Sequence, residues 1–143
     1  MVLVDGNLLI YAGVAGQAEH LAAAEWLHKE FTAGHRMGLP GPSLLAFLRI
    51  STNPRLYERP ARIEEALGVV EGWLRFPTVW VPGATARHGE ILGGLLTHVR
   101  AQGNTVPDAP LEALAIEHGL ELSSTDSNFA RFEGLRWRNP LRG

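Results

Sequence analysis

Three isolated aspartates stand where acids could share a metal ion. Asp5 ends the apolar run Met-Val-Leu-Val, Asp126 follows a strand-like run, and Asp108 lies in the first turn of a predicted helix. A carboxylate at the carboxyl end of a parallel strand faces the crevice in which open sheets bind ligands. Clustered carboxylates repel one another unless a cation neutralises them, and hard oxygen ligands suit Mg²⁺ or Mn²⁺. The pattern therefore predicts one shared metal site.

Each acid also has an ordinary structural interpretation. Asp5 can cap the helix that follows it, Asp108 can interact with the dipole of its own helix, and Asp126 can form a turn. Whether the three side chains meet in the folded chain decides between these interpretations and the metal site.

A metal site of this kind performs hydrolysis at phosphorus. A cation that bridges a phosphate oxygen and a water lowers the pKa of the water and stabilises the charge that builds up during in-line attack. Asp5 and Asp108 are predicted to hold the cation directly or through water. Two roles stay open for Asp126, as a further ligand or as the general base. Thr125 and Asn128 are predicted to hold the acids in position through hydrogen bonds.

Three further polar residues have two interpretations each. Asn7 and Asn104 can support the site, or they can start a helix and form a Gly-Asn turn, respectively. Glu112 lies one helical turn after Asp108 and can bring another carboxylate to the metal, although we expect it to be solvated.

Strand-like and helical runs alternate along the chain, which predicts an α/β fold with a mostly parallel sheet covered by helices. Strands are expected at 2–5, 37–39, 79–81 and 120–124, and a fifth edge strand at 135–137. Helices are expected at 7–15, 20–33, 42–50, 63–74, 84–100 and 107–118. No internal repeat or linker interrupts the pattern, so residues 1–143 should form a single domain.

Composition excludes several classes of function. The chain has no cysteine, which excludes a disulfide framework, a thiolate zinc site and a cysteine nucleophile. It has no apolar run of the roughly 18 residues that span a membrane and no signal-peptide pattern, so we expect a cytoplasmic protein. The formal net charge is −2. Any surface for nucleic acid must therefore be a local patch, which arginines would form because Lys29 is the only lysine.

Four motifs stand in order along the whole chain. They are Leu-Val-Asp-Gly-Asn-Leu-Leu from residue 3, Phe-Leu-Arg-Ile-Ser-Thr-Asn-Pro from residue 47, Asp-Ala-Pro-Leu-Glu-Ala-Leu from residue 108, and Ser-Thr-Asp-Ser-Asn-Phe from residue 124. Together they resemble the PIN-domain ribonucleases, and more narrowly the VapC toxins of bacterial toxin–antitoxin pairs. The tail Arg-Trp-Arg-Asn-Pro-Leu at 136–141 is similar to the branch abundant in mycobacteria.

The resemblance implies a three-layer α/β/α domain with four or five central strands and a Mg²⁺- or Mn²⁺-dependent endoribonuclease activity on tRNA or another structured RNA. It implies Asp5, Asp108 and Asp126 as the acids of the site. Arg49 is a candidate for contact with RNA phosphate, or it pairs with an acid in the core.

Two positions depart from the family pattern. Most PIN domains carry a glutamate where this chain has Ala46, and many relatives carry an aspartate at Asn128. Fewer acids predict weaker metal binding with more water ligands, as Mg²⁺ tolerates. The same departures motivate the rival interpretation, a catalytically silent module that binds RNA or antitoxin without cleavage.

The resemblance also implies a cognate antitoxin that inhibits the enzyme and forms a toxin–antitoxin hetero-oligomer with it. We expect the antitoxin to lay an apolar helix into a groove and to direct an arginine toward the acids, because a guanidinium can replace the cation. We expect a homodimer to form through the early helices, with Trp26 and Leu27 as exposed apolar contacts.

Other classes fit the residues less well. A haloacid-dehalogenase-like phosphotransferase needs a second aspartate at the position of Asn7, and a dinucleotide-binding domain needs a glycine-rich loop after its first strand. The six histidines show no spacing typical of zinc ligands.

Overall fold

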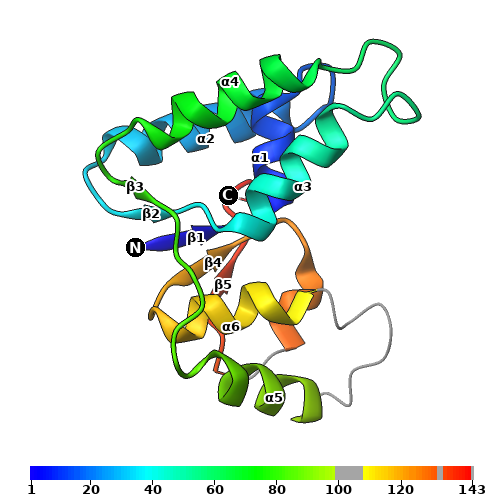
Figure 1. The fold of residues 1–143 in the computed structure, drawn as a ribbon. Coiled ribbons are helices and arrows are strands. Elements are labelled where there is room, and N and C mark those ends of the chain that lie inside the picture. Colours follow the sequence, from blue (N-terminus) through cyan, green and yellow to red (C-terminus); the bar gives the residue numbers. More distant parts are fainter. Residues whose placement is uncertain (99–107, 132–133, 143) are drawn as a thin grey trace.

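The computed structural model describes residues 1–98, 108–131 and 134–142. Its strands form one five-stranded sheet in the order β3-β2-β1-β4-β5, and each neighbouring pair is parallel (Figure 1). The strands are β1 (Val2–Val4), β2 (Met37–Gly38), β3 (Val79–Trp80), β4 (Glu121–Ser123) and β5 (Trp137–Arg138). This confirms the α/β class, the parallel sheet and the fifth strand at an edge.

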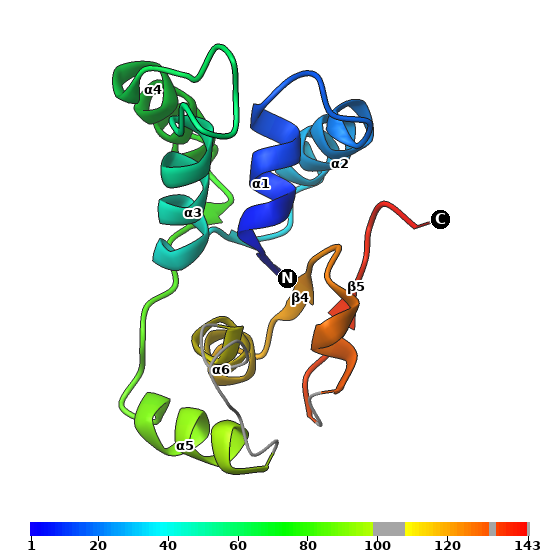
Figure 2. The ribbon, with the colours of Figure 1, turned by 90° about the vertical axis from the view of Figure 1, so that its right-hand side faces the viewer.

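Helices cover both faces of the sheet, as the three-layer prediction requires. They are α1 (Gly6–Gly13), α2 (His20–Thr32), α3 (Gly41–Ser51), α4 (Ile63–Leu74), α5 (His88–His98) and α6 (Ala109–Glu117), followed by the 3₁₀ helix η2 (Ser127–Arg131). In both views α1 to α4 gather on one side of the sheet, and α5 and α6 lie on the other (Figures 1 and 2).

Two apolar cores lie on the two sides of the sheet. Neighbouring strand residues point to opposite faces, and in β1 Val4 packs into the core beneath α1 to α4, whereas Leu3 packs into the core beneath α6. The first core also contains Leu27, Phe31 and Phe47. Strand β1 is therefore buried on both faces, which explains its uninterrupted apolar sequence.

The first core corrects one prediction. Leu27 is only 3% exposed and belongs to this core, and Trp26 is partly buried against it. The expectation that these residues form an exposed dimer contact is wrong for Leu27, because the stripe that α2 buries is Ala23, Leu27 and Phe31. The homodimer itself stays a prediction.

Helix α5 begins four residues later than the sequence pattern predicts. Residues 84–87 are not helical, and 86–87 form a turn; Thr85 is held by Glu117 of α6 through its backbone N–H (2.8 Å) and its hydroxyl (2.6 Å). His88 Nδ1 lies 2.5 Å from the other carboxylate oxygen of Glu117. In the described part of the chain, no helix is long and apolar enough to cross a membrane.

Candidate active site

The register of the sheet brings the carboxyl ends of β1 and β4 together. Val4 lies opposite Ser123 in the parallel pair, so the residues that follow, Asp5 and Ser124, leave the sheet side by side. The backbone N–H of Asp5 donates to the carbonyl of Ser123 at 3.0 Å. The two strands therefore deliver their first polar side chains to one point at the edge of the sheet.

Ser124 connects three of the candidate residues through one buried hydroxyl. Its Oγ donates to Asp5 Oδ2 at 2.6 Å, and it accepts from Asn7 Nδ2 at 3.2 Å and from the backbone N–H of Asp126 at 3.0 Å. The side chain is fully buried. Sequence reasoning assigned Ser124 no role, although its place after β4 and two residues before Asp126 was an available signal.

Asn7 reaches from the first turn of α1 to the end of β4. Its Nδ2 also donates to Thr125 Oγ1 at 2.8 Å. Its Oδ1 is buried and has no hydrogen-bond partner. Asn7 and Thr125 are thus joined beside Ser124, and Asn7 has one unpartnered oxygen acceptor; their supporting role stays a prediction.

Asp5 lies within electrostatic range of each of the two other acids. Burial, the largest effect, raises the pKa of the Asp5 carboxyl above its ordinary value, and the nearby carboxylates of Asp108 and Asp126 raise this pKa further. Hydrogen bonds from Ser124 and from the backbone N–H of Gly6 oppose the rise without cancelling it. Asp5 stands at the N-cap of α1, but its side chain makes no capping hydrogen bond. The capping interpretation of Asp5 is therefore wrong.

Asp126 and Asp108, which both affect the pKa of Asp5, also stand at the starts of helices. Asp126 Oδ1 accepts from the backbone N–H of Asn128 at 2.9 Å, which forms the turn into η2 and orients the carboxylate. Asn128 takes part through its backbone, and its side chain is exposed. Asp108 stands at the N-cap of α6, where a carboxylate interacts favourably with the helix dipole.

The remaining candidates lie in three different settings. Glu112 is fully buried on α6, so the expectation of a solvated glutamate is wrong. Arg49 is exposed on α3 and makes no ion pair with any described residue, so it does not pair with an acid of the core. Asn104 lies outside the described residues.

Ala46 stands directly beside the acid site. A Cβ atom added to Gly6, the residue after Asp5, would lie 2.9 Å from the Cβ of Ala46. Helices α1 and α3 therefore approach closely at this point, and glycine is required there because any side chain would collide with α3. The family's usual glutamate would stand next to Asp5 at this position.

The donor atoms at the strand ends suit a hard cation that keeps much of its hydration. Among the residues that the structure describes, no three His, Cys, Asp or Glu side chains form a group that could hold a metal ion. Asp5 contributes a partly buried carboxylate, and Asn7, which shares the Ser124 hydroxyl with it, has an unpartnered Oδ1. Mg²⁺ accepts one or two carboxylates and fills its other positions with water, so these residues fit Mg²⁺ or Mn²⁺ better than a fully protein-ligated ion.

Comparison with known proteins agrees with this geometry. The PIN domain family model matches residues 2–135. The chain is 40% identical over 140 residues to "Ribonuclease VapC37" of Mycobacterium tuberculosis, covering 98% of this chain and 97% of that protein.

Solved structures share the fold over nearly the whole chain. The VapBC2 complex of Rickettsia felis bound to a promoter DNA fragment matches with a TM-score of 0.67 at 17% identity, covering 97% of this chain and 98% of that one. VapC20 of Mycobacterium tuberculosis, described as a sarcin-ricin loop cleaving toxin, matches with a TM-score of 0.65 at 18% identity and covers 95% and 99%. The chain belongs to the VapC ribonucleases of the PIN-domain family.

Proposed function

We propose that the chain is the toxin of a toxin–antitoxin pair and cleaves RNA with a Mg²⁺ or Mn²⁺ ion held near Asp5, Asp108 and Asp126. The observation that carries the proposal is the partly buried carboxyl of Asp5, held by Ser124 at 2.6 Å, whose pKa burial raises and the two other acids raise further. A cation would relieve this repulsion. The relative VapC37, named a ribonuclease, supports cleavage of RNA as the reaction.

The residues around the ion have separable tasks. When bound, the ion supplies a water of lowered pKa and charge stabilisation at the phosphate. Asp5 and Asp108 would hold the ion, and Ser124 keeps Asp5 oriented through the 2.6 Å hydrogen bond. Asp126, oriented by the backbone of Asn128, would orient the attacking water or complete the site.

The RNA would lie along α3, beside the acids. Ala46 contacts the start of α1 next to Asp5, and Arg49 is exposed one turn further along the same helix. Leu45, 66% exposed and four residues before Arg49, offers an apolar surface next to that cation. A structured RNA such as a tRNA or an rRNA loop is the proposed substrate class, in keeping with the loop-cleaving relative VapC20.

The proposed partners are a VapB-type antitoxin in the cytoplasm and a second copy of the chain. The antitoxin proposal is supported by the VapBC complex among the structural neighbours. The antitoxin would inhibit by placing an arginine at the acids, where the guanidinium takes the place of the cation. High Mg²⁺ or Mn²⁺ should then weaken the hold of that arginine.

Cleavage of total RNA by the purified protein tests the function. We expect activity with Mg²⁺ or Mn²⁺, none with chelator, and loss of most activity in Asp5→Asn, whereas Glu64→Gln, an exposed acid on α4, should cleave normally. RNA binding without cleavage under all these conditions would favour the silent module, for which Ala46 and Asn128 are the motivating observations. Cleavage that persists in chelator would refute the metal-dependent proposal.

A further inference from the structure

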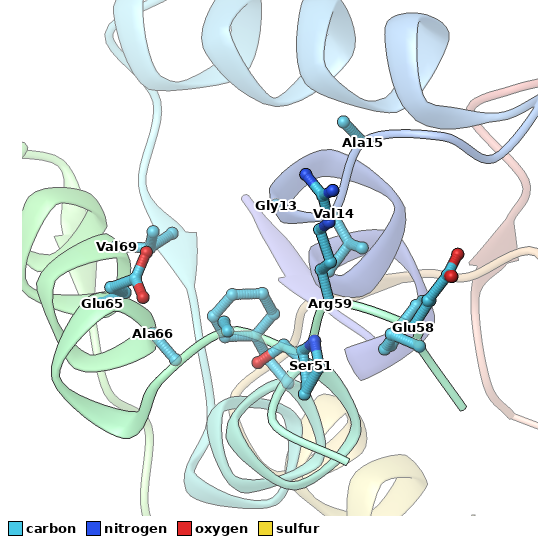
Figure 3. Close-up of a pocket in the computed structure, with 13 residues that line it drawn as sticks. Gly13, Val14, Ala15, Ser51, Glu58, Arg59, Glu65, Ala66 and Val69 are labelled. Carbon is cyan, nitrogen blue, oxygen red and sulfur yellow. The ribbon is translucent and has the colours of Figure 1, made fainter. Parts of the chain in front are cut away.

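A cavity of about 650 Å³ lies at the opposite end of α1 from the acids (Figure 3). It is enclosed by the end of α1, the end of α3, the loop 52–62 and the start of α4. Asp5 precedes the first residue of α1, and the cavity meets its last residue, Gly13, which is about 12 Å away along eight helical residues. Its volume falls within the range of small-molecule sites.

The apolar wall of the cavity is held in place by close packing. A Cβ atom on Gly13 would lie 2.6 Å from the ring of Phe47, so glycine at this position lets the ring pack directly against α1. The ring of Trp73 supports Phe47 from another side, with ring centroids 4.8 Å apart. Phe47 is almost completely buried, so its ring is fixed in the wall of the cavity.

The loop that closes the cavity is also held at both ends. The backbone N–H of Ala61 donates to the carbonyl of Ser51 at 3.0 Å, and Gln17 Nε2 donates to the hydroxyl of Tyr57 at 3.1 Å. These bonds tie the loop to the end of α3 and to the segment between α1 and α2. The cavity is therefore formed before any ligand arrives.

Ser51, one of the residues that line this cavity, has an unused hydroxyl. The residue is 3% exposed, and its Oγ is buried without a hydrogen-bond partner. A serine or threonine hydroxyl in a helix ordinarily bonds to a carbonyl of the preceding turn, as that of the neighbouring Thr52 does with Leu48 at 2.7 Å. Buried polar groups are nearly always satisfied, so the free hydroxyl of Ser51 points to a ligand oxygen.

The mouth of the cavity carries one arginine and two glutamates. Arg59 is exposed, makes no ion pair with the described residues, and extends toward Gly13 and Val14 (Figure 3). Glu65, across the cavity on α4, is already paired with Arg62 at 3.2 Å. The carboxylate of Glu58 points away from Ser51 in Figure 3. The available charge for a ligand is therefore the guanidinium of Arg59.

We propose that this cavity binds a small amphipathic carboxylate that also carries a carbonyl or ether oxygen. The apolar body packs on Phe47 and Ala66, the carboxylate pairs with Arg59, and the second oxygen accepts from Ser51. Guanidinium binds carboxylates through two parallel hydrogen bonds, which orients the ligand as well as holding it. This site is separate from the acids and does not rest on the ribonuclease activity.

Three matched probes test the proposal by calorimetry and by NMR titration of the full chain. The first is 4-oxo-4-phenylbutanoate, which has the aryl body, the ketone and the carboxylate. The second, 4-phenylbutanoate, lacks the ketone, and the third, 4-oxo-4-phenylbutanamide, lacks the charge. We expect the first to bind most tightly, with each of the others weaker by about tenfold, because each lacks one directed hydrogen-bonding group.

Variants separate the two polar contacts. Arg59→Gln should weaken binding of the two carboxylate probes and leave binding of the amide probe unchanged. Arg55 is an exposed arginine of the same loop that does not line the cavity, so Arg55→Gln should not change the affinity for any probe. Ser51→Ala should remove the difference in affinity between the probes with and without the ketone. It should not lower the melting temperature, because the hydroxyl has no hydrogen-bond partner among the described residues.

Two results would overturn the proposal. One is the absence of saturable binding for all three probes. If, in addition, an antitoxin peptide is the one ligand that binds in the cavity, the cavity belongs to a protein partner. The other is probe binding that neither Arg59→Gln nor Ser51→Ala changes.

Discussion

Replacing Ser124 by alanine should damage both the stability and the activity of the protein. The fully buried hydroxyl makes one hydrogen bond to the partly buried carboxylate of Asp5, at 2.6 Å, and accepts two others at 3.0 and 3.2 Å. A hydrogen bond to a charged group contributes about 1.5–3 kcal/mol, and an N–H left unsatisfied by burial costs about 1–3 kcal/mol. Asn7 keeps its bond to Thr125, so we expect a loss of roughly 2–4 kcal/mol in the free energy of unfolding.

The effect on activity should appear chiefly at limiting metal. Ser124 is a positioning residue, because it orients Asp5 and the backbone of Asp126 without being an expected ligand itself. Loss of such a supporting contact typically lowers metal affinity or activity by about 10–100-fold. The substitution also removes a hydrogen bond that lowers the pKa of Asp5, so the pH at which cleavage begins should move upward.

Urea unfolding and RNA cleavage over a series of Mg²⁺ concentrations and pH values measure these effects. Ser123→Ala is the matched control, because Ser123 is also buried on β4 and its hydroxyl makes no hydrogen bond to the described residues. The reasoning is refuted if Ser124→Ala unfolds with the same free energy as the Ser123→Ala protein and its cleavage depends on metal and pH as in the unmodified protein.

Three further predictions follow from the same contacts. Asp5→Asn should raise the melting temperature in chelator at neutral pH, and the gain should fade as the pH falls toward 3.8, because a raised folded-state pKa makes the native carboxyl more stable protonated; an unchanged melting temperature would contradict this. Gly6→Ala should destabilise the fold by about 1–3 kcal/mol, because its Cβ would lie 2.9 Å from that of Ala46, and urea unfolding measures it. Hydrogen bonds from Thr85 and His88 outweigh the effect of burial and lower the pKa of Glu117. Melting curves of Glu117→Gln should therefore show a loss of stability at neutral pH that disappears as acid protonates Glu117 in the unmodified protein.

The alternation of strand and helix signals was enough to predict the sheet and its layers. Short apolar runs such as 2–4, buried on both faces, are typical of central parallel strands. The same reasoning placed Asp5 and Asp126 at strand ends, where the structure has them. Periodicity failed for the start of α5, because the contact between Thr85 and Glu117 is tertiary and leaves no local signal.

Glu112 and Ser124 show what a local pattern does not reveal. Glu112 is buried because α6 has apolar residues around its whole circumference, and a helix of that kind is enclosed on all sides. That signal was present in the sequence, but the solvated interpretation considered only the spacing from Asp108. A serine at a strand end is ordinary in sequence, and its bonds with Asp5 and Asn7 depend on the register between β1 and β4.

The two departures from the family pattern have different physical consequences. At position 46 the small side chain allows α1 to approach α3 beside Asp5. The alanine therefore removes an acid and also allows the two helices to pack closely. Asn128 serves the site through its backbone N–H, a contact that an aspartate would make equally well. Fewer acids than usual repel the Asp5 carboxylate less, and the hydrogen bond from Ser124 favours its charged form, as the positive charge of a bound cation would. A metal ion and an antitoxin arginine can both supply that charge, which is the physical reason to expect them to compete for one site.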